Sequence, residues 1–371
     1  IESLYITRSI QNKADLLTTE SDTVTNQILL VNQLSNLSLQ LYSWYIKNGH
    51  ARNNKDIAEL KNFFEKNLSV HATKATGFYE KLYLYQSYVW YAFIRQDFLQ
   101  YYRYSQKWVD AFTTYPELLK TETASYIKGV HNLMTAQFSL LSQDKLAKSI
   151  KQFESFTKQK FLQDNENNRI LAYQYLYTAR INLYFLQGNF TKGLRLVPFL
   201  EEMLKEYSLY LDTHRVLVFY YKIACLYFGS GNNEKAIDYL NRIINQKGDL
   251  RTDLQCYSRL LHLIAHYELG NFDLLEYLIK SVYRYMAKME NLSKVEEEMF
   301  AFLRRSFHVG AKALKPEFEK LVTKLKKYEG NALESRAFVY LDVISWLKSK
   351  INGVDVQDVI KEKYSEGKKR K

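Results

Sequence analysis

Hydrophobic residues recur along the chain at the spacing of an amphipathic helix. Between residues 233 and 245 the apolar side chains stand three and four residues apart, and charged or amide side chains fill most other positions. Residues 272–288 repeat this arrangement, and neither stretch shows the strict alternation of a half-buried strand. The pattern therefore predicts an all-α protein.

Short polar dipeptides separate these amphipathic runs, and successive ones lie 47, 45, 43 and 39 residues apart. Glycine readily takes the left-handed conformation that ends a helix. Asp or Asn then caps the next helix by accepting a hydrogen bond from its unpaired N–H groups. Each unit is therefore predicted to be an antiparallel helical hairpin. The five predicted turns are Gln96-Asp97, Gln143-Asp144, Gly188-Asn189, Gly231-Asn232 and Gly270-Asn271.

Further signals extend the series toward both ends. We expect one turn near Gly49, another near Lys315-Pro316, and a last long helix from Gly330 through Lys348. Pro198 falls inside the second helix of its hairpin and should kink or break it, because proline lacks an N–H donor. A hairpin cannot bury both apolar faces alone, so roughly 15–17 helices are expected to stack into an α-solenoid.

The unit around Gly231 resembles the tetratricopeptide repeat. Its two helices carry the aromatic, small and apolar residues of that repeat in order, while Gly248 replaces the usual final proline. The matching residues are Tyr220, Ile223, Ala224, Tyr227, Ala236 and Leu240. The resemblance implies a right-handed superhelix of hairpins, which most often serves as a scaffold or peptide receptor. A fold alone does not fix a function.

The neighbouring units match this repeat more loosely, and their intervals overlap those of HEAT and armadillo repeats. No Pro-, Gly- or Ser-rich linker divides the chain. We therefore expect one helical-repeat domain over residues 1–371, with the clearest repeats over 80–290 and a basic C-terminal helix and tail over 312–371.

Composition excludes several other classes. With 47% hydrophobic residues, 3 prolines and 13 glycines in 371 positions, the chain is neither disordered nor a turn-rich β protein. Cys225 and Cys256 are too few for a disulfide framework or a cysteine-rich zinc site. No apolar run is long enough to cross a membrane, and the sparse cysteines favour the cytoplasm.

The formal charge of +12 is spread along the chain, with one basic cluster in the C-terminal region. That cluster would suit nucleic acid or an anionic membrane surface, but it would equally serve as a solubilising face and a frayed tail. No helix-turn-helix, zinc finger or base-stacking motif accompanies it, so no specific nucleic-acid partner is predicted.

No enzyme signature stands out in the sequence. Phosphate-loop, dinucleotide, nucleophile-elbow and zinc-protease motifs do not occur, so we predict neither catalysis nor a cofactor. His262 and His266 stand four residues apart and could reach one metal from one helix face, but no third ligand is evident, and no metal site is predicted. They could instead line the groove of the solenoid or be partly buried.

The first helices of such hairpins line the concave face of the stack. An Asn side chain can bond a peptide backbone there while Lys and Arg meet carboxylates, which would suit an acidic peptide or a C-terminal carboxylate. This resembles an incomplete carboxylate clamp of some tetratricopeptide proteins; the alternative is a solvated groove. The candidate residues are Tyr175, Thr178, Asn182, Phe185, Tyr221, Lys222, Arg259, His262 and His266, with Cys225 and Phe228 beside them.

Two functional hypotheses follow. The first is a non-catalytic scaffold that binds a protein or peptide segment in the groove over about 170–270. The second is a peptide-responsive regulatory receptor whose N-terminal DNA-binding domain is missing from this sequence. An α-helical barrel enzyme would need clustered carboxylates in a closed cavity, and the sequence offers none.

Overall fold

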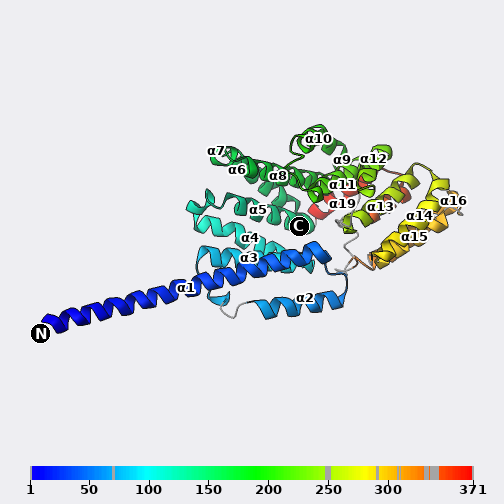
Figure 1. Cartoon of the computed structure of the whole chain (residues 1–371). Coiled ribbons are helices and arrows are strands. Elements are labelled where there is room, and N and C mark those ends of the chain that lie inside the picture. The colour runs from blue at the N-terminus through cyan, green and yellow to red at the C-terminus, as the bar shows by residue number, and fades with distance from the viewer. Residues whose placement is uncertain are drawn as a thin grey trace. The chain divides into compact units, whose positions relative to one another are not determined.

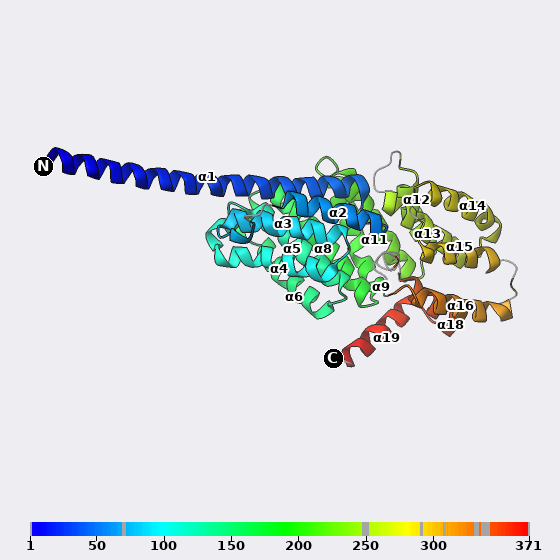
Figure 2. The same ribbon diagram turned by 90° about the horizontal axis from the view of Figure 1, so that it is seen from below.

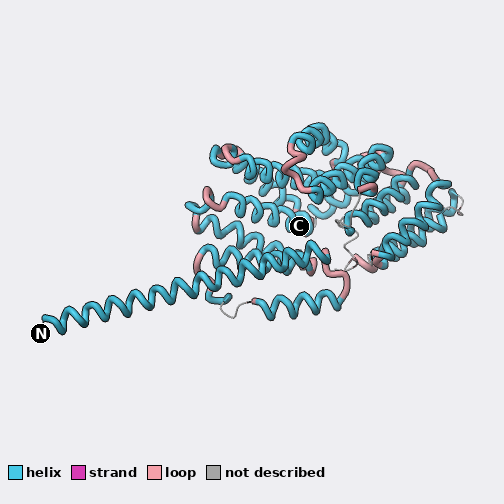
Figure 3. Tube along the Cα trace, in the orientation of Figure 1, coloured by secondary structure: helices cyan, strands magenta, loops and turns pink. Residues whose placement is uncertain are grey.

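The structure is a computed structural model that describes residues 2–68, 72–246, 252–289, 292–306, 309, 311–329, 334 and 342–369. These residues form α-helices, short 3₁₀ helices and turns, without a strand (Figures 1 and 3). The predicted all-α class is confirmed. The chain groups into two compact units, 1–136 and 137–371, and each is described by itself. The single repeat domain stays a prediction.

In the first unit, the inner half of the long helix α1 packs against α2 and α3. Leu37 and Leu41 of α1 are buried with Leu60 of α2 and Ile94 of α3 in one small apolar cluster, and Leu34 is buried in another with Ala72. A second core lies between α3 and α4. The helices are α1 (Glu2–Asn48), α2 (Asn54–Asn67), α3 (Phe78–Ile94) and α4 (Phe98–Thr114), with 3₁₀ turns η1 (Ala72–Lys74) and η2 (Pro116–Leu119). Helix α5 (Thr123–Ser139) begins in this unit, and its last residues, from Gln137, belong to the second.

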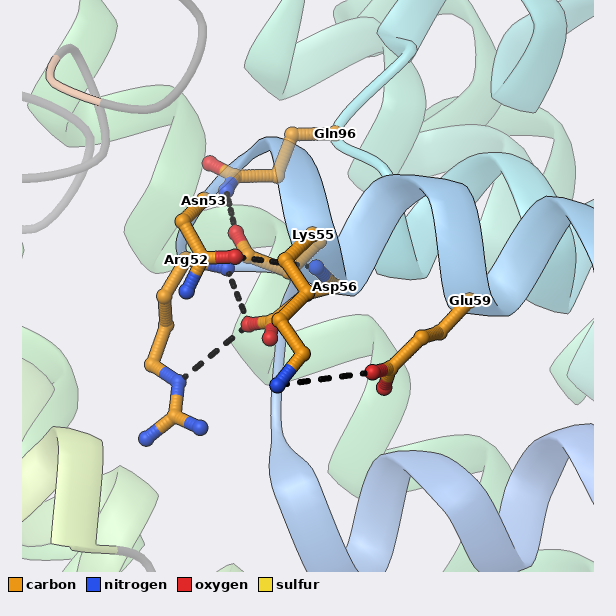
Figure 4. A network of polar contacts seen from close by, with 7 residues as sticks. Arg52, Asn53, Lys55, Asp56, Glu59 and Gln96 are labelled. Carbon is orange, nitrogen blue, oxygen red and sulfur yellow. Dashed lines mark hydrogen bonds and ion pairs between the residues drawn. The ribbon is translucent and has the colours of Figure 1, made fainter.

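The turn between α1 and α2 is bonded to the turn between α3 and α4 (Figure 4). The Ala51 N–H donates to the Ile94 carbonyl at 2.9 Å, and the buried Gln96 amide donates to the Ala51 carbonyl at 3.4 Å. Asn53 caps α2 by accepting from the Asp56 N–H at 2.9 Å. The predicted turn at Gly49, with φ of 72°, is confirmed.

In the second unit, helices that follow one another in the chain pack side by side. The helices from residue 166 onward contribute to one large apolar core that runs from Ile170 to Ile360. The helices are α6 (Gln143–Thr157), α7 (Lys160–Gln163), α8 (Glu166–Leu186), α9 (Phe190–Gly193), η3 (Leu194–Leu196), α10 (Val197–Glu206), α11 (Thr213–Gly229), α12 (Asn233–Ile244), α13 (Thr252–Glu268), α14 (Phe272–Lys288), α15 (Lys294–Ser306), α16 (Ala311–Lys326), α18 (Val343–Asn352) and α19 (Val356–Lys369).

One turn geometry recurs five times among the residues that the structure describes. A residue with positive φ ends the first helix and donates its N–H to the carbonyl three residues back, and the next N–H bonds the carbonyl five residues back. This pair of bonds is the Schellman motif, which satisfies carbonyls left open at a helix end. The positive-φ residues are Gln96, Leu141, Gly188, Gly231 and Gly270.

Four of the five predicted turns are therefore confirmed, and one is misplaced. Residue Leu141, with φ of 53°, makes the turn assigned to Gln143, because α6 already begins at Gln143. A leucine in this conformation gives no glycine signal in the sequence. An aromatic side chain precedes each of the five positions by three residues, which aligns the turns better than glycine does. These residues are Phe93, Phe138, Phe185, Phe228 and Tyr267.

Two predictions for the C-terminal region are wrong. The turn expected at Lys315-Pro316 does not form, because α16 begins at Ala311 and Pro316 lies inside it. The last long helix does not end at Lys348: α18 continues to Asn352, Gly353 ends it with φ of 66°, and α19 follows. The expected start of that helix at Gly330 lies outside the described residues.

Pro198 breaks its helix, as predicted. The residues after Gly188 form the short α9, the 3₁₀ turn η3, and then α10, with Pro198 in the first turn of α10. Proline is tolerated there because the first N–H groups of a helix have no partner within it.

Glycine lets α9 and α11 approach closely. A Cβ on Gly193 would lie 2.5 Å from Leu226, and a Cβ on Gly229 would overlap the ring of Phe190. Both glycines are helical, so they serve here as small residues in a contact between helices rather than as turns.

The C-terminal helices α18 and α19 contact helices and turns that lie far earlier in the sequence. A Cβ on Gly188 would lie 2.5 Å from the Gln357 carbonyl oxygen of α19, and the Thr191 hydroxyl donates to the Gln357 side chain at 3.0 Å. The indole N–H of Trp346 in α18 donates to Glu268 of α13 at 2.6 Å, and Lys350 pairs with the same carboxylate. A purely linear stack would have contacts between neighbouring units only.

Candidate partner-binding face of helices α8, α11 and α13

The nine candidate groove residues lie on three helices of the second unit, and none of them is fully exposed. Tyr175, Asn182, Tyr221, His262 and His266 are buried. Thr178, Phe185, Lys222 and Arg259 are half-buried. The sequence pattern predicted the helices correctly but treated these positions as an open surface, because periodicity does not report how deeply a face is covered.

Lys222 and Asn182 form the centre of this face. The Lys222 ammonium donates to the Asn182 side-chain oxygen at 2.5 Å. It also lies 5.6 Å from the ring centre of Phe185 and 5.8 Å from that of Phe138 at the end of α5. The electron-rich ring faces attract the cation. The sequence analysis named Asn182, Lys222 and Phe185 but missed Phe138. Phe138 stands three residues before the positive-φ residue Leu141, as Phe185 does before Gly188, so aligning the units on these turn residues would have found it.

Burial lowers the pKa of Lys222 from 10.5 to about 8, because the charged ammonium loses its hydration. Nearby Cys225 acts in the opposite direction. No carboxylate pairs with Lys222 among the residues that the structure describes. Burial raises the pKa of Cys225 to about 12, so its thiol is protonated and unreactive at neutral pH.

Tyr175 lies beside a second cation, Arg215, near the first turn of α11. The guanidinium stands 5.2 Å from the Tyr175 ring centre and donates to Gln174 at 2.9 Å and to Asp212 at 3.0 Å. Unlike Lys222, Arg215 therefore has a carboxylate partner. A hollow of about 200 Å³ opens here, lined by Asn167, Ile170, Leu171, Gln174, Tyr210, Asp212 and Arg215. Its polar residues carry no motif that the sequence could reveal.

Arg259 is engaged within the fold rather than with Lys222. Its guanidinium stacks on Tyr285 of α14 at 3.9 Å and donates to the Gln255 side chain and to the Ile244 carbonyl. Burial lowers its pKa, although the neighbouring Tyr285 acts against this. The predicted trio of Asn182, Lys222 and Arg259 is therefore joined only at its first two members in the contacts described.

His262 and His266 contact each other directly. Their Nε2 atoms lie 3.2 Å apart, and the Asn271 amide lies 3.0 Å from Nδ1 of His266. Burial, with His266 and Arg259 close by, lowers the pKa of His262 to about 4, and burial also lowers that of His266. Both rings are therefore neutral at pH 7. No group of three potential metal ligands occurs within the described residues.

The residues that resemble the tetratricopeptide repeat lie where close packing is needed. Ala224 of α11 and Ala236 of α12 are completely buried, and these two helices pack directly against each other. Small side chains let helix backbones approach. Gly248 lies outside the described residues, and the identity of the repeat stays a prediction.

Two of the five lysines of α16 are seen in ion pairs. Lys320 bonds Glu317 at 2.7 Å, and Lys324 bonds Glu298 of α15 at 2.8 Å. The pKa of the Glu317 carboxyl is lowered chiefly by the Lys320 hydrogen bond. The role of the basic region, residues 312–371, stays a prediction.

Comparison with known proteins gives no family for this chain. No family model matches the sequence, and no curated protein matches it. Among the helices described, none combines the length and apolar character needed to span a bilayer. The cytoplasmic location stays a prediction.

Proposed function

We propose that the chain is a non-catalytic helical-repeat protein that binds an acidic segment of a partner protein along helices α8, α11 and α13. The finer architecture is part of this proposal: a solenoid of antiparallel, tetratricopeptide-like hairpins with a right-handed twist. Its support is the Schellman turn that recurs at intervals of 45, 47, 43 and 39 residues between helices that are adjacent in the sequence. Such stacks expose the first helix of each unit to a ligand.

The observation that carries the proposal is the unpaired charge of Lys222. Among the described residues, the side-chain oxygen of Asn182 and two aromatic rings contact this desolvated ammonium, and a charge in such surroundings costs stability unless an anion joins it. A carboxylate of a partner would supply that anion, and Asn182 has further hydrogen-bonding capacity to hold the partner's backbone. Arg215, seven residues and so about 10 Å earlier on the same face of α11, would meet the same segment.

Affinity capture from the native cell extract, read by mass spectrometry, tests this function. The bait proteins are the wild type, Lys222→Met, and Lys235→Met as a matched control. Lys235 is exposed on α12 and pairs with Asp238 at 3.3 Å, away from the proposed face. We expect the wild type and the control to capture the same partner and Lys222→Met to lose it.

Two results would contradict the proposal. Capture of the same partner in equal amount by Lys222→Met would show that Lys222 does not contribute to binding. Turnover of a small molecule by the purified chain would show that the protein is an enzyme. Once a partner is known, synthetic segments with free and amidated carboxylates will identify the group that meets Lys222. The regulatory-receptor alternative concerns residues beyond this sequence and stays a prediction.

A further inference from the structure

The hollow beside Arg215 lies between the N-terminal parts of two neighbouring helices. Helices α8 and α11 pack side by side (Figures 1 and 2). α11 contributes Arg215 from its first turn and is capped by Asp212. The four residues that α8 contributes share one helix face, because they follow the i, i+3, i+4, i+7 spacing: Asn167, Ile170, Leu171 and Gln174.

Gln174 brings a hydrogen-bond donor to the hollow. Its side chain is 4% exposed, and its oxygen accepts from the Arg215 guanidinium at 2.9 Å. Its amide N–H groups have no acceptor among the residues that the structure describes, and their nitrogen is not fully enclosed by protein. A largely desolvated donor without an acceptor costs stability, so this amide is suited to a ligand that supplies one.

Arg215 adds further donors to the same place. A guanidinium has five N–H groups, and Asp212, Gln174 and Tyr175 engage three of them. Two therefore remain for a ligand among the contacts described. The positive ends of the α8 and α11 dipoles also favour a negative group here. These features together suit a carboxylate, which can accept two parallel hydrogen bonds from a guanidinium.

Asp212 supplies the opposite charge. Its oxygens accept from the Arg215 backbone N–H at 2.8 Å and from the Arg215 guanidinium at 3.0 Å. A carboxylate has about four lone pairs, so each oxygen can accept a further hydrogen bond. The Asp212 side chain is 58% exposed, and an ammonium group can therefore reach it. Because Asp212 and Arg215 balance in charge, the hollow favours a neutral ligand that carries both charges.

Ile170 and Leu171 make the apolar part of the hollow, between the two amide residues of α8. Ile170 is buried and Leu171 is half-buried. The volume of about 200 Å³ equals about seven waters at about 30 Å³ each. It lies below the range of about 300–1,000 Å³ that holds drug-sized ligands. One small molecule with a short apolar chain fits this space better than a peptide segment does.

We propose that this hollow binds a free α-amino acid with an apolar side chain. Arg215 and Gln174 hold the carboxylate, Asp212 holds the ammonium, and the side chain packs on Ile170 and Leu171. The inference goes beyond the proposed function, because neither Lys222 nor Asn182 lines the hollow and only Arg215 is common to both. Amino-acid binding is measured without a partner protein, so either proposal can fail without the other.

Isothermal titration calorimetry of the full chain with L-leucine tests the site. We expect a Kd of about 10 µM to 1 mM, since a small ligand makes few contacts. Three analogues each lack one recognised group: isocaproate lacks the ammonium, isoamylamine lacks the carboxylate, and glycine lacks the apolar side chain. Each should bind at least tenfold more weakly than L-leucine.

Three results of these titrations would overturn the proposal. They are no binding of L-leucine, L-isoleucine, L-valine or L-methionine, equally tight binding of isocaproate and L-leucine, and binding of a tripeptide that ends in leucine without binding of free L-leucine. The last result would assign the hollow to a peptide terminus instead.

Variants locate the binding site. Arg215→Gln and Gln174→Leu should each weaken L-leucine binding at least tenfold, with circular dichroism confirming that they fold. Arg242→Gln is the matched control and should bind like the wild type. Arg242 also stacks on a tyrosine, Tyr239 at 4.4 Å, and pairs with Glu201 at 3.7 Å, but it does not line the hollow. Equal affinities in all these proteins would place the binding elsewhere and refute the assignment.

Asp212→Asn tests the ammonium contact without removing the helix cap, because asparagine caps helices as well as aspartate does. This variant should lower the affinity for L-leucine to that of isocaproate, since the ammonium then has no carboxylate to meet. An unchanged affinity for L-leucine would show that Asp212 does not hold the ammonium and would refute the proposed ligand class.

Discussion

Replacing Lys222 by methionine tests whether this ammonium is held at a cost to stability. Methionine keeps the unbranched shape and removes the charge. A pKa lowered from 10.5 to about 8 corresponds to about 3 kcal/mol that favours the neutral amine in the folded state. The variant leaves the buried Asn182 amide without this hydrogen-bond partner, which costs about 2 kcal/mol and offsets part of the gain. Lys222→Met should therefore be about 1 kcal/mol more stable than the wild type at pH 7.

The pH dependence provides the sharper signature. The folded protein releases the Lys222 proton near pH 8 and the unfolded chain near 10.5, so the unfolded chain binds more protons in between. Stability of the wild type should then rise with pH through this window. We expect a gain of about 2 kcal/mol between pH 7 and pH 9.5 relative to Lys222→Met, whose side chain does not titrate.

Urea unfolding at both pH values, followed by circular dichroism, measures this difference. Titration of other groups cancels between the two proteins. Lys235→Met should behave as the wild type, and Asn182→Leu combined with Lys222→Met should recover any loss that comes from leaving the buried amide unpaired. Equal pH dependence in the wild type and in Lys222→Met would show that the ammonium stays hydrated and would refute the reasoning.

Three further changes test other contacts of the second unit. Gly229→Ala should cost about 1–3 kcal/mol in urea unfolding, because the new methyl group overlaps Phe190; an unchanged midpoint would contradict the close approach. Because the pKa of His262 is about 4 in the folded protein, the unfolded chain binds a proton first as the pH falls below about 6.5. The free energy of unfolding should therefore fall by up to about 3 kcal/mol between pH 6.5 and pH 4, and His262→Gln should reduce this pH dependence. The same pH dependence in the wild type and the variant would show that His262 does not cause it. Glu268→Gln should speed amide hydrogen exchange in α18, because it breaks the half-buried ion pair with Lys350. Glu276→Gln is the control, because it breaks an exposed pair and should leave this exchange unchanged. Equal exchange in the wild type and both variants would show that the Glu268–Lys350 pair does not stabilise α18.

Local signals explain why the helices could be predicted so well. A glycine at positive φ followed by an amide cap is a property of a few consecutive residues, and it correctly marked Gly188, Gly231 and Gly270. The same logic failed at Leu141, where a leucine takes the strained conformation, and at Pro316, which a helix accommodates. At the exposed Leu141 the two backbone hydrogen bonds of the Schellman motif form without a glycine, and at the exposed Pro316 the helix continues although proline has no N–H to donate.

The candidate site depended more strongly on distant parts of the chain. Helical periodicity placed Asn182 and Lys222 on facing positions of neighbouring helices, and they do meet. Periodicity could not show that Arg259 stacks on Tyr285 instead, because the choice among several donors and rings depends on how α14 packs. It also missed Phe138, which belongs to a different helix.

The amphipathic pattern and the turn residues alone determined that this chain is a series of helices in a fixed order, since both act over one or two helical turns. The tertiary structure decided the features that long-range packing controls. These are the burial of the Lys222 ammonium, the contact between α19 and Gly188, and which half of α1 has no other helix against it. Such contacts join residues far apart in the sequence, and no local pattern encodes which apolar face finds a neighbour.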